Sequence, residues 1–206
     1  MNSESNFSVL LDFIESRFKE YLEEETRIRR NPKFEDNRVD VLLYFIEPTG
    51  KGLTQFDRQA MKTLSRRVNV IPVLAKGDSY APDELQLMKQ LVTEEIRAED
   101  IPIYDFLLDD ESEVDDDAQF EEDEMSGENE RLRRMLPFCV IGADPESYPK
   151  RGRSYPWGFA DADNEQFSNL LVLKGVLFGS HLFDIKEKTQ NVLYENFRTE
   201  VLSSKN

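Results

Sequence analysis

The sequence has very little of the two residue types that build disulfide frameworks and zinc sites. Cys139 is its only cysteine and His181 its only histidine. A single cysteine excludes an internal disulfide and is typical of a reducing compartment, and a single histidine without partner ligands cannot hold a zinc ion. We therefore expect no metal site, a core position for Cys139, and a place for His181 where it lines or caps the last helix.

Long apolar runs are also missing. No run approaches the roughly 20 residues that a transmembrane helix needs, and residues 1–5 lack the basic and apolar regions of a signal peptide. These absences predict a soluble cytosolic protein. The 206 residues suit one domain, and a hydrophobic fraction of 39% with 14 Phe excludes a wholly disordered chain.

Basic residues are absent from one strongly acidic segment. Residues 109–130 hold 13 Asp and Glu and no Lys or Arg, so they supply −13 of the net charge of −16 and leave −3 for the rest. Such a composition predicts a disordered acidic insert on a nearly balanced domain. Its alternative role is the capture of basic proteins. The overall acidity argues against nucleic acid or an anionic membrane as the partner of the single chain.

Short apolar runs predict buried strands, and amphipathic stretches predict helices between them. Strands are expected at residues 39–46, 68–74, 101–106, 138–141 and 159–162, helices at residues 6–30, 54–64, 82–98, 167–178 and 181–202, and a loop at residues 142–158. This alternation predicts an α/β fold with a mainly parallel sheet flanked by helices, and in such sheets ligands bind beyond the carboxyl ends of the strands.

The tetrapeptide Ala75-Lys76-Gly77-Asp78 follows a predicted buried strand at that binding edge. A carboxylate here suits guanine, because Asp78 can accept hydrogen bonds from both N1–H and the exocyclic amine, a charge-assisted pair that adenine cannot reproduce. The Lys76 stem can lie along the base. The alternative is structural, since Asp78 or Ser79 is also a good N-cap for the helix that opens at Pro82.

Two further segments carry candidate binding residues. The loop around Gly142 offers backbone N–H groups that can hold guanine O6, although an ordinary turn explains it equally well. Residues 151–158 (RGRSYPWG) contain the only tryptophan, Trp157, together with Tyr155 and Arg153. Arginine guanidinium planes stack on bases, and Trp and Arg also dominate protein interfaces. A packed aromatic corner is the alternative for this segment.

Five segments, in this order, resemble a known family: LLYFIEPTGKGL, VNVIPVLAKGDS, PFCVIGAD, RGRSYPWG and LYENFRTEVLS. They resemble septins, which are guanine-nucleotide-binding proteins of the P-loop class that polymerise into cytoskeletal filaments. The resemblance runs from about residue 8 to the end of the chain, and EPTG and LFGSHL look most like fungal septins at or near octamer ends. It implies that residues 1–206 form a partial septin-type G domain, its C-terminal half.

The resemblance implies a role for each matching residue. Lys76 and Asp78 match the base-specificity motif, Gly142 matches the glycine of the fifth G motif, and Arg153 matches the arginine that stacks on guanine. In the complete family protein the ligand is GTP or GDP. Gly77 stands where the family usually has Ala, a change that we expect to loosen the loop.

The resemblance also implies partners, namely other septin subunits in homo- or hetero-oligomers. Trp157 and Tyr155 match the nucleotide-side (G) interface, and residues 181–202 resemble a helix of the opposite (NC) interface. Lys51 replaces a histidine that commonly reaches the neighbouring subunit's nucleotide, and Lys can still meet a phosphate as a point charge. The implied location is a cytoplasmic septin ring at the division site or cell cortex, with membrane contacts made only by the assembled filament.

The motifs that bind phosphate and Mg²⁺ are missing. The sequence contains no Gly-x4-Gly-Lys-Ser/Thr and no Asp-x-x-Gly, and we expect the phosphate cradle and switch loops to precede Met1. Since phosphoryl transfer depends on positioning around phosphates and metal, we expect no catalytic residues, no Mg²⁺ site, weak nucleotide binding and no GTP hydrolysis. The alternative is an active GTPase completed by an N-terminal segment. A sheet edge left open would favour self-association.

Overall fold

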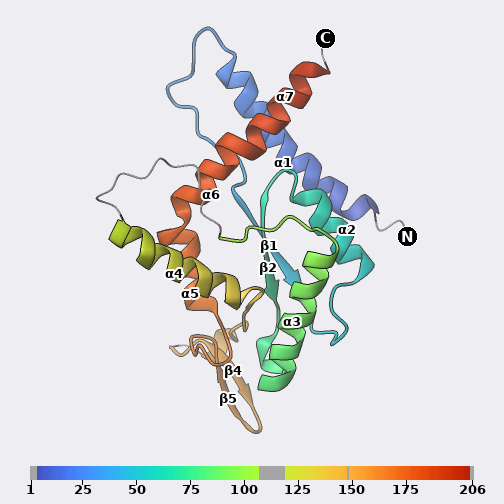
Figure 1. The fold of residues 1–206 in the computed structure, drawn as a ribbon, viewed down its shortest axis with the longest axis vertical. Coiled ribbons are helices and arrows are strands. Elements are labelled where there is room, and N and C mark those ends of the chain that lie inside the picture. The colour runs from blue at the N-terminus through green and yellow to red at the C-terminus, as the bar shows by residue number, and fades with distance from the viewer. Residues whose placement is uncertain (1–3, 107–118, 148, 205–206) are drawn as a thin grey trace.

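The computed structural model describes residues 4–106, 119–147 and 149–204. Its main sheet has three parallel strands in the order β1-β2-β3, formed by Val41–Ile46, Asn69–Leu74 and Phe138–Cys139. The central strand β2 is buried along its whole length, because the apolar run of residues 69–74 is covered on both faces. A second sheet is the antiparallel hairpin of β4 (Gly152–Tyr155) and β5 (Gly158–Asp161) (Figure 1).

Helices lie on both faces of the main sheet (Figure 1). They are α1 (Glu4–Glu25), α2 (Gln55–Leu64), α3 (Pro82–Ala98), α4 (Gln119–Met135), α5 (Leu170–Gly175), α6 (Leu182–Lys188) and α7 (Glu195–Ser203). Side chains of β2 alternate between the two layers, as the two-residue period of a strand requires. Val70 and Leu74 pack with α2 and α3, whereas Ile71 and Val73 pack with α4, α5 and α6. The predicted α/β fold with a flanked parallel sheet is confirmed.

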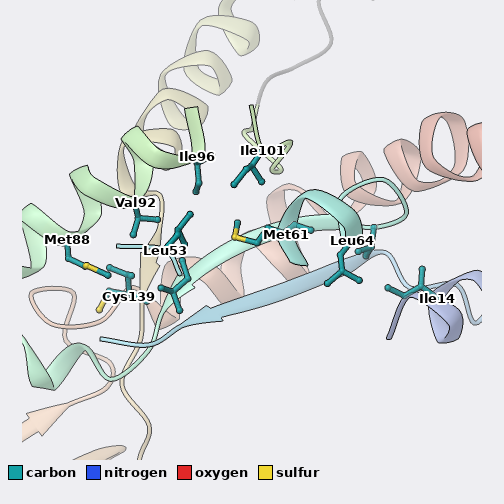
Figure 2. Close-up of a cluster of buried hydrophobic side chains, with 13 residues drawn as sticks. Ile14, Leu53, Met61, Leu64, Met88, Val92, Ile96, Ile101 and Cys139 are labelled. Atoms are coloured by element: carbon teal, nitrogen blue, oxygen red, sulfur yellow. The ribbon is translucent and has the colours of Figure 1, made fainter. Parts of the chain in front are cut away.

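The layer under α2 and α3 is the larger apolar cluster (Figure 2). Met61 of α2 and Val92 of α3 are fully buried there, and Cys139 reaches it from β3 with 1% of its surface exposed. The core position predicted for Cys139 is therefore confirmed. Thr54 caps α2 with a reciprocal capping box, in which Asp57 N donates to its hydroxyl and its own N–H donates to the Asp57 carboxylate.

A separate cluster joins the two ends of the described chain. Phe18 of α1 packs on Tyr194 and Phe197, and all three side chains are at most 2% exposed. His181 precedes α6 and is buried, where its Nε2 lies 2.9 Å from the Asn129 amide oxygen. Burial lowers the pKa of His181. His181 was predicted to line or cap the last helix; it occupies the position before α6 but makes no side-chain capping bond, and its ring contacts α4 instead.

Several predicted elements differ from the structure. Residues 101–106 form no strand, although Tyr104 N donates to Val70 O of β2 (2.8 Å), on a strand that β3 pairs with only at Val73 and Leu74. The loop predicted at 142–158 contains β4, and the predicted last two helices are interrupted by π-helical turns at Val176–Ser180 and Thr189–Tyr194.

The acidic segment is only partly described. Residues 119–130 belong to α4, whereas residues 107–118 lie outside the described residues, and the disordered insert at residues 109–130 stays a prediction. The carboxyl end of α4 is anchored by Leu132, 3% exposed, and by the Asn129 contact with His181. Within the described ranges, no helix has both the length and the apolar character needed to cross a membrane.

Candidate functional site

The loop after β2 presents the predicted specificity carboxylate. Residues Gly77–Ser79 form a short 3-10 turn, entered through Lys76 in the left-handed region (φ 54°). Lys76 is exposed, whereas the Asp78 side chain is 0% exposed. Asp78 is not the N-cap of α3, which was the alternative role for it. This helix begins after Ala81, whose N–H donates to the Glu84 carboxylate (2.9 Å).

The loops after β2 and β3 are packed directly on each other. Gly77 N donates to Val140 O (3.0 Å), which ties the two loops together. A Cβ on Gly77 would lie 2.5 Å from Cys139 Sγ and 2.7 Å from Phe167 O, well inside contact distance. Glycine at position 77 therefore allows a close approach of the two loops, in contrast to the looser loop expected from the sequence.

Two half-buried polar side chains, Asn169 and Lys89, hold the loop after β3. Asn169 N donates to Cys139 O (2.6 Å), and its side-chain oxygen accepts from Cys139 N (3.0 Å) and Lys89 Nζ (3.1 Å). Burial lowers the pKa of Lys89 and raises the pKa of the Cys139 thiol to about 11. Sequence reasoning missed Lys89 and Asn169, because neither lies in a recognisable motif.

The β4–β5 hairpin brings three side chains to this edge. Arg153 lies between two carboxylates, with Nη1 3.4 Å from Asp78 Oδ2 and Nε 3.7 Å from Asp144 Oδ1. The Tyr155 hydroxyl donates to Asp78 Oδ2. Tyr155 was expected only at a subunit interface, and the structure places it in the candidate guanine site. Trp157 stacks on Tyr155 with ring centroids 4.8 Å apart and an interplanar angle of 7°, and it is 70% exposed.

The loop around Gly142 supplies free backbone donors. Gly142 is exposed, and a Cβ placed on it would meet nothing within 4 Å. Within the part of the chain that the structure describes, the N–H groups of Gly142 and Ala143 have no hydrogen-bond partner. These donors lie next in sequence to Asp144, which pairs with Arg153. They are therefore available to a ligand carbonyl at the same sheet edge.

Lys51 lies in the loop after β1, and its ammonium contacts none of the other candidate residues. This loop is held by α3: Leu53 N donates to Glu95 Oε2 (2.6 Å), and Arg58 pairs with the other oxygen of the same carboxylate (2.8 Å). Gly52 has a φ of 74°, and the space beside it is filled by the Glu95 carboxylate. Among the described residues, Lys51 is an exposed cation without an ion-pair partner.

The carboxylate of Asp78 offers a ligand one unpaired acceptor. Asp78 Oδ1 is buried and has no hydrogen-bond partner, and leaving a buried carboxylate oxygen unpaired costs about 1–3 kcal/mol or more. Arg153 contacts the other oxygen of this carboxylate, and the loop that carries Gly142 is tied to the Asp78 loop by the Gly77 N to Val140 O bond. Across the described ranges, no group of three or more His, Cys, Asp or Glu side chains is placed to hold a metal ion.

The parallel sheet with helices on both faces, and with its candidate ligand loops at the carboxyl ends of β2 and β3, defines a doubly wound α/β domain. The family model for septins matches residues 1–206, and the chain belongs to the septin family.

Comparison with individual proteins agrees. The chain is 40% identical over 208 residues to "Septin homolog spn3" of Schizosaccharomyces pombe (99% of this chain, 54% of that protein). It is 41% identical over 214 residues to "Cell division control protein 11" of Saccharomyces cerevisiae (98% and 48%). The crystal structure of Cdc11 from Saccharomyces cerevisiae superposes with a TM-score of 0.65 at 32% identity, covering 96% of this chain and 76% of that one. The chain thus spans about half the length of these two relatives.

Proposed function

We propose that this chain is the guanine-selecting half of a septin-type G domain and that it acts through contacts with other septin subunits in filaments. The observation that carries the guanine part is the buried, unpaired Oδ1 of Asp78, whose other oxygen contacts Arg153. The free N–H groups of Gly142 and Ala143 belong to the neighbouring loop, which Gly77 N ties to the Asp78 loop through Val140 O. A carboxylate can accept two donors from guanine but finds no such pair on adenine.

Each predicted residue has a role in this proposal. Asp78 accepts from the guanine N1–H and exocyclic amine, and the Gly142 loop donates to O6. Arg153 stacks on the base, and the exposed stem of Lys76 lies along it. The proposal needs Arg153 to turn from its present contacts with Asp78 and Asp144, which at 3.4 and 3.7 Å are long for hydrogen bonds.

Phosphate chemistry is not expected of these 206 residues. They contain neither Gly-x4-Gly-Lys-Ser/Thr nor Asp-x-x-Gly, the motifs that place phosphates and Mg²⁺ for transfer. We therefore expect the isolated chain to hydrolyse no GTP. In a protein that also carries those motifs, the same edge would select GTP or GDP over the adenine nucleotides.

The subunit contacts are assigned to two surfaces. The exposed Trp157, with Tyr155 behind it and Lys51 on the same edge of the main sheet, belongs to the nucleotide-side interface, and the helices of residues 181–202 belong to the opposite one. The relative "Cell division control protein 11" is named for cell division. We accordingly assign the chain to cytoplasmic septin assemblies at the division site, where it would contribute to cytokinesis.

Calorimetric titration with guanosine tests the guanine assignment without involving phosphates. We expect guanosine to bind and adenosine not to bind, and Asp78→Asn to weaken guanosine binding at least tenfold, because an amide offers one acceptor where the carboxylate offers two. Asp83→Asn is the matched control, since this exposed residue of α3 loses the same charge away from the site. Equal binding of guanosine and adenosine, or GTP hydrolysis by the purified chain, would contradict the proposal.

A further inference from the structure

The Asp78 carboxylate is asymmetrically occupied. Oδ2 receives two donors, the Tyr155 hydroxyl and Arg153 Nη1, whereas Oδ1 is buried and receives none. The Tyr155 hydroxyl is the closer of these two donors, so it occupies the space beside Oδ2 that a further donor would need. The side chain is 0% exposed, and water therefore does not replace these contacts.

Guanine recognition by Asp78 requires both oxygens, one for N1–H and one for the exocyclic amine. Oδ1 is available, and Arg153 turns away from Oδ2 when it stacks on the base, so the Tyr155 hydroxyl is the donor that still occupies Oδ2. The hydrogen bond to Asp78 raises the pKa of Tyr155, so the phenol is a protonated donor at neutral pH.

Tyr155 is the last residue of β4 and lies opposite Gly158 in the hairpin. Its ring is stacked on Trp157, so the same side chain contacts the base-specificity carboxylate and the exposed tip. The base of the hairpin is tied to the rest of the chain by two backbone bonds, Asp144 N to Gly152 O (2.9 Å) and Ala162 N to Arg151 O (2.8 Å). The tip carrying Trp157 lies beyond these ties.

We propose that Tyr155 is a latch that closes the guanine site when it is empty, and that guanine binding displaces its hydroxyl from Asp78 and moves the hairpin tip with Trp157. This inference rests on the proposed function, because it assumes that Asp78 binds guanine. A ligand that binds only the unlatched state shifts the population toward that state. The occupancy of the base site is thereby coupled to the conformation of an exposed tryptophan.

Tyr155→Phe tests the latch, because it removes the hydroxyl and keeps the ring stacked on Trp157. We expect guanosine to bind about tenfold more tightly to Tyr155→Phe than to the unmodified chain, as measured by calorimetry. Ser154→Ala is the matched control, since it removes a hydroxyl from the neighbouring exposed position of β4 and should leave the affinity unchanged.

Trp157 supplies a second readout, because it is the only tryptophan. In the unmodified chain, guanosine but not adenosine should change the Trp157 fluorescence, and this change should be smaller in Tyr155→Phe, whose ring is already released from Asp78. Guanosine binding that depends on Asp78 but is equal or weaker in Tyr155→Phe would overturn the latch and leave the proposed function standing. Absence of guanosine binding to every variant would overturn both.

Discussion

The two ends of this molecule use their polar side chains in opposite ways. At the α1–α7 end, the buried Tyr194 donates to Glu25 (2.6 Å), and Arg67 is shared by Glu15 and Glu200. At the hairpin end, on the opposite side of the main sheet (Figure 1), Asp78 keeps a buried oxygen without a partner, and Trp157 is exposed. The pairs made by Tyr194 and Arg67 contribute to folding at the first end, although Arg38 Nη1 and Arg198 Nε there are also buried without a hydrogen-bond partner. By contrast, the unpaired oxygen of Asp78 at the second end is available to a ligand.

Backbone conformation follows the same division. The α1–α7 end is helical, and its apolar side chains Phe18, Tyr194 and Phe197 form a closed cluster. At the hairpin end, the loop that carries Asp78 contains Lys76 in the left-handed conformation (φ 54°). This conformation costs a non-glycine residue about 1 kcal/mol or more. We therefore expect substitutions at the first end to change stability and those at the second to change binding.

The largest effect is expected from Phe18→Ala. Phe18 is 0% exposed and packs on both Tyr194 and Phe197, so its removal leaves a cavity and should lower the free energy of unfolding by about 3–5 kcal/mol. Chemical denaturation measures this loss. Phe13→Ala is the matched control on the same helix, because Phe13 is 51% exposed and its loss should change stability by about 0.5 kcal/mol or less. Equal losses in the two variants would show that the cluster does not hold this end together.

The complementary substitution is Trp157→Ala at the hairpin tip. Because Trp157 is 70% exposed, its loss should leave the unfolding free energy nearly unchanged. At an interface the same truncation typically costs about 2 kcal/mol, which is roughly a thirtyfold weaker affinity. Sedimentation and pull-down with a purified septin subunit from the same cells measure the effect. If Trp157→Ala destabilised the fold while subunit affinity stayed constant, the division between the two ends would be wrong.

The sheet could be predicted from the sequence more completely than the hairpin. Residues 69–74 are apolar without interruption, and this run is enough to predict a buried central strand. By contrast, β4 consists of Gly, Arg, Ser and Tyr, a composition without strand periodicity, and it forms because β5 pairs with it. Residues 101–106 show the reverse case, since this strand-like sequence forms no strand and contacts β2 through the bond from Tyr104 N to Val70 O.

The candidate site was predicted in the same uneven way. Asp78, Arg153 and the Gly142 loop could be assigned to one sheet edge from strand order and motif resemblance, and the structure brings them together. The contact of Tyr155 with Asp78 could not be predicted, because it joins residues 77 positions apart through the fold of the hairpin. Lys89 and Asn169 could not be predicted, because a half-buried lysine on a helix and a loop asparagine have no distinguishing pattern in a sequence.

The smallest effect, and the only one that depends on pH, is expected from Arg67→Met. The hydrogen bond from Arg67 lowers the pKa of Glu200, so this pair stabilises the fold above the unfolded pKa of Glu, about 4.3, and the contribution is lost as the pH falls through the folded pKa. Since the Glu200 side chain is 60% exposed, the loss at pH 7 should be only about 1 kcal/mol, and methionine retains the stem that packs near Phe197.

Unfolding free energies at pH 7 and pH 3 should therefore show a difference between the chain and Arg67→Met that shrinks in acid. Arg66→Met, at an exposed neighbouring position, should show little difference at either pH. If the loss of unfolding free energy in Arg67→Met stayed constant with pH, packing rather than charge would make the contribution. The contrast between the α1–α7 end and the hairpin end would then rest on Tyr194 and Asp78 alone.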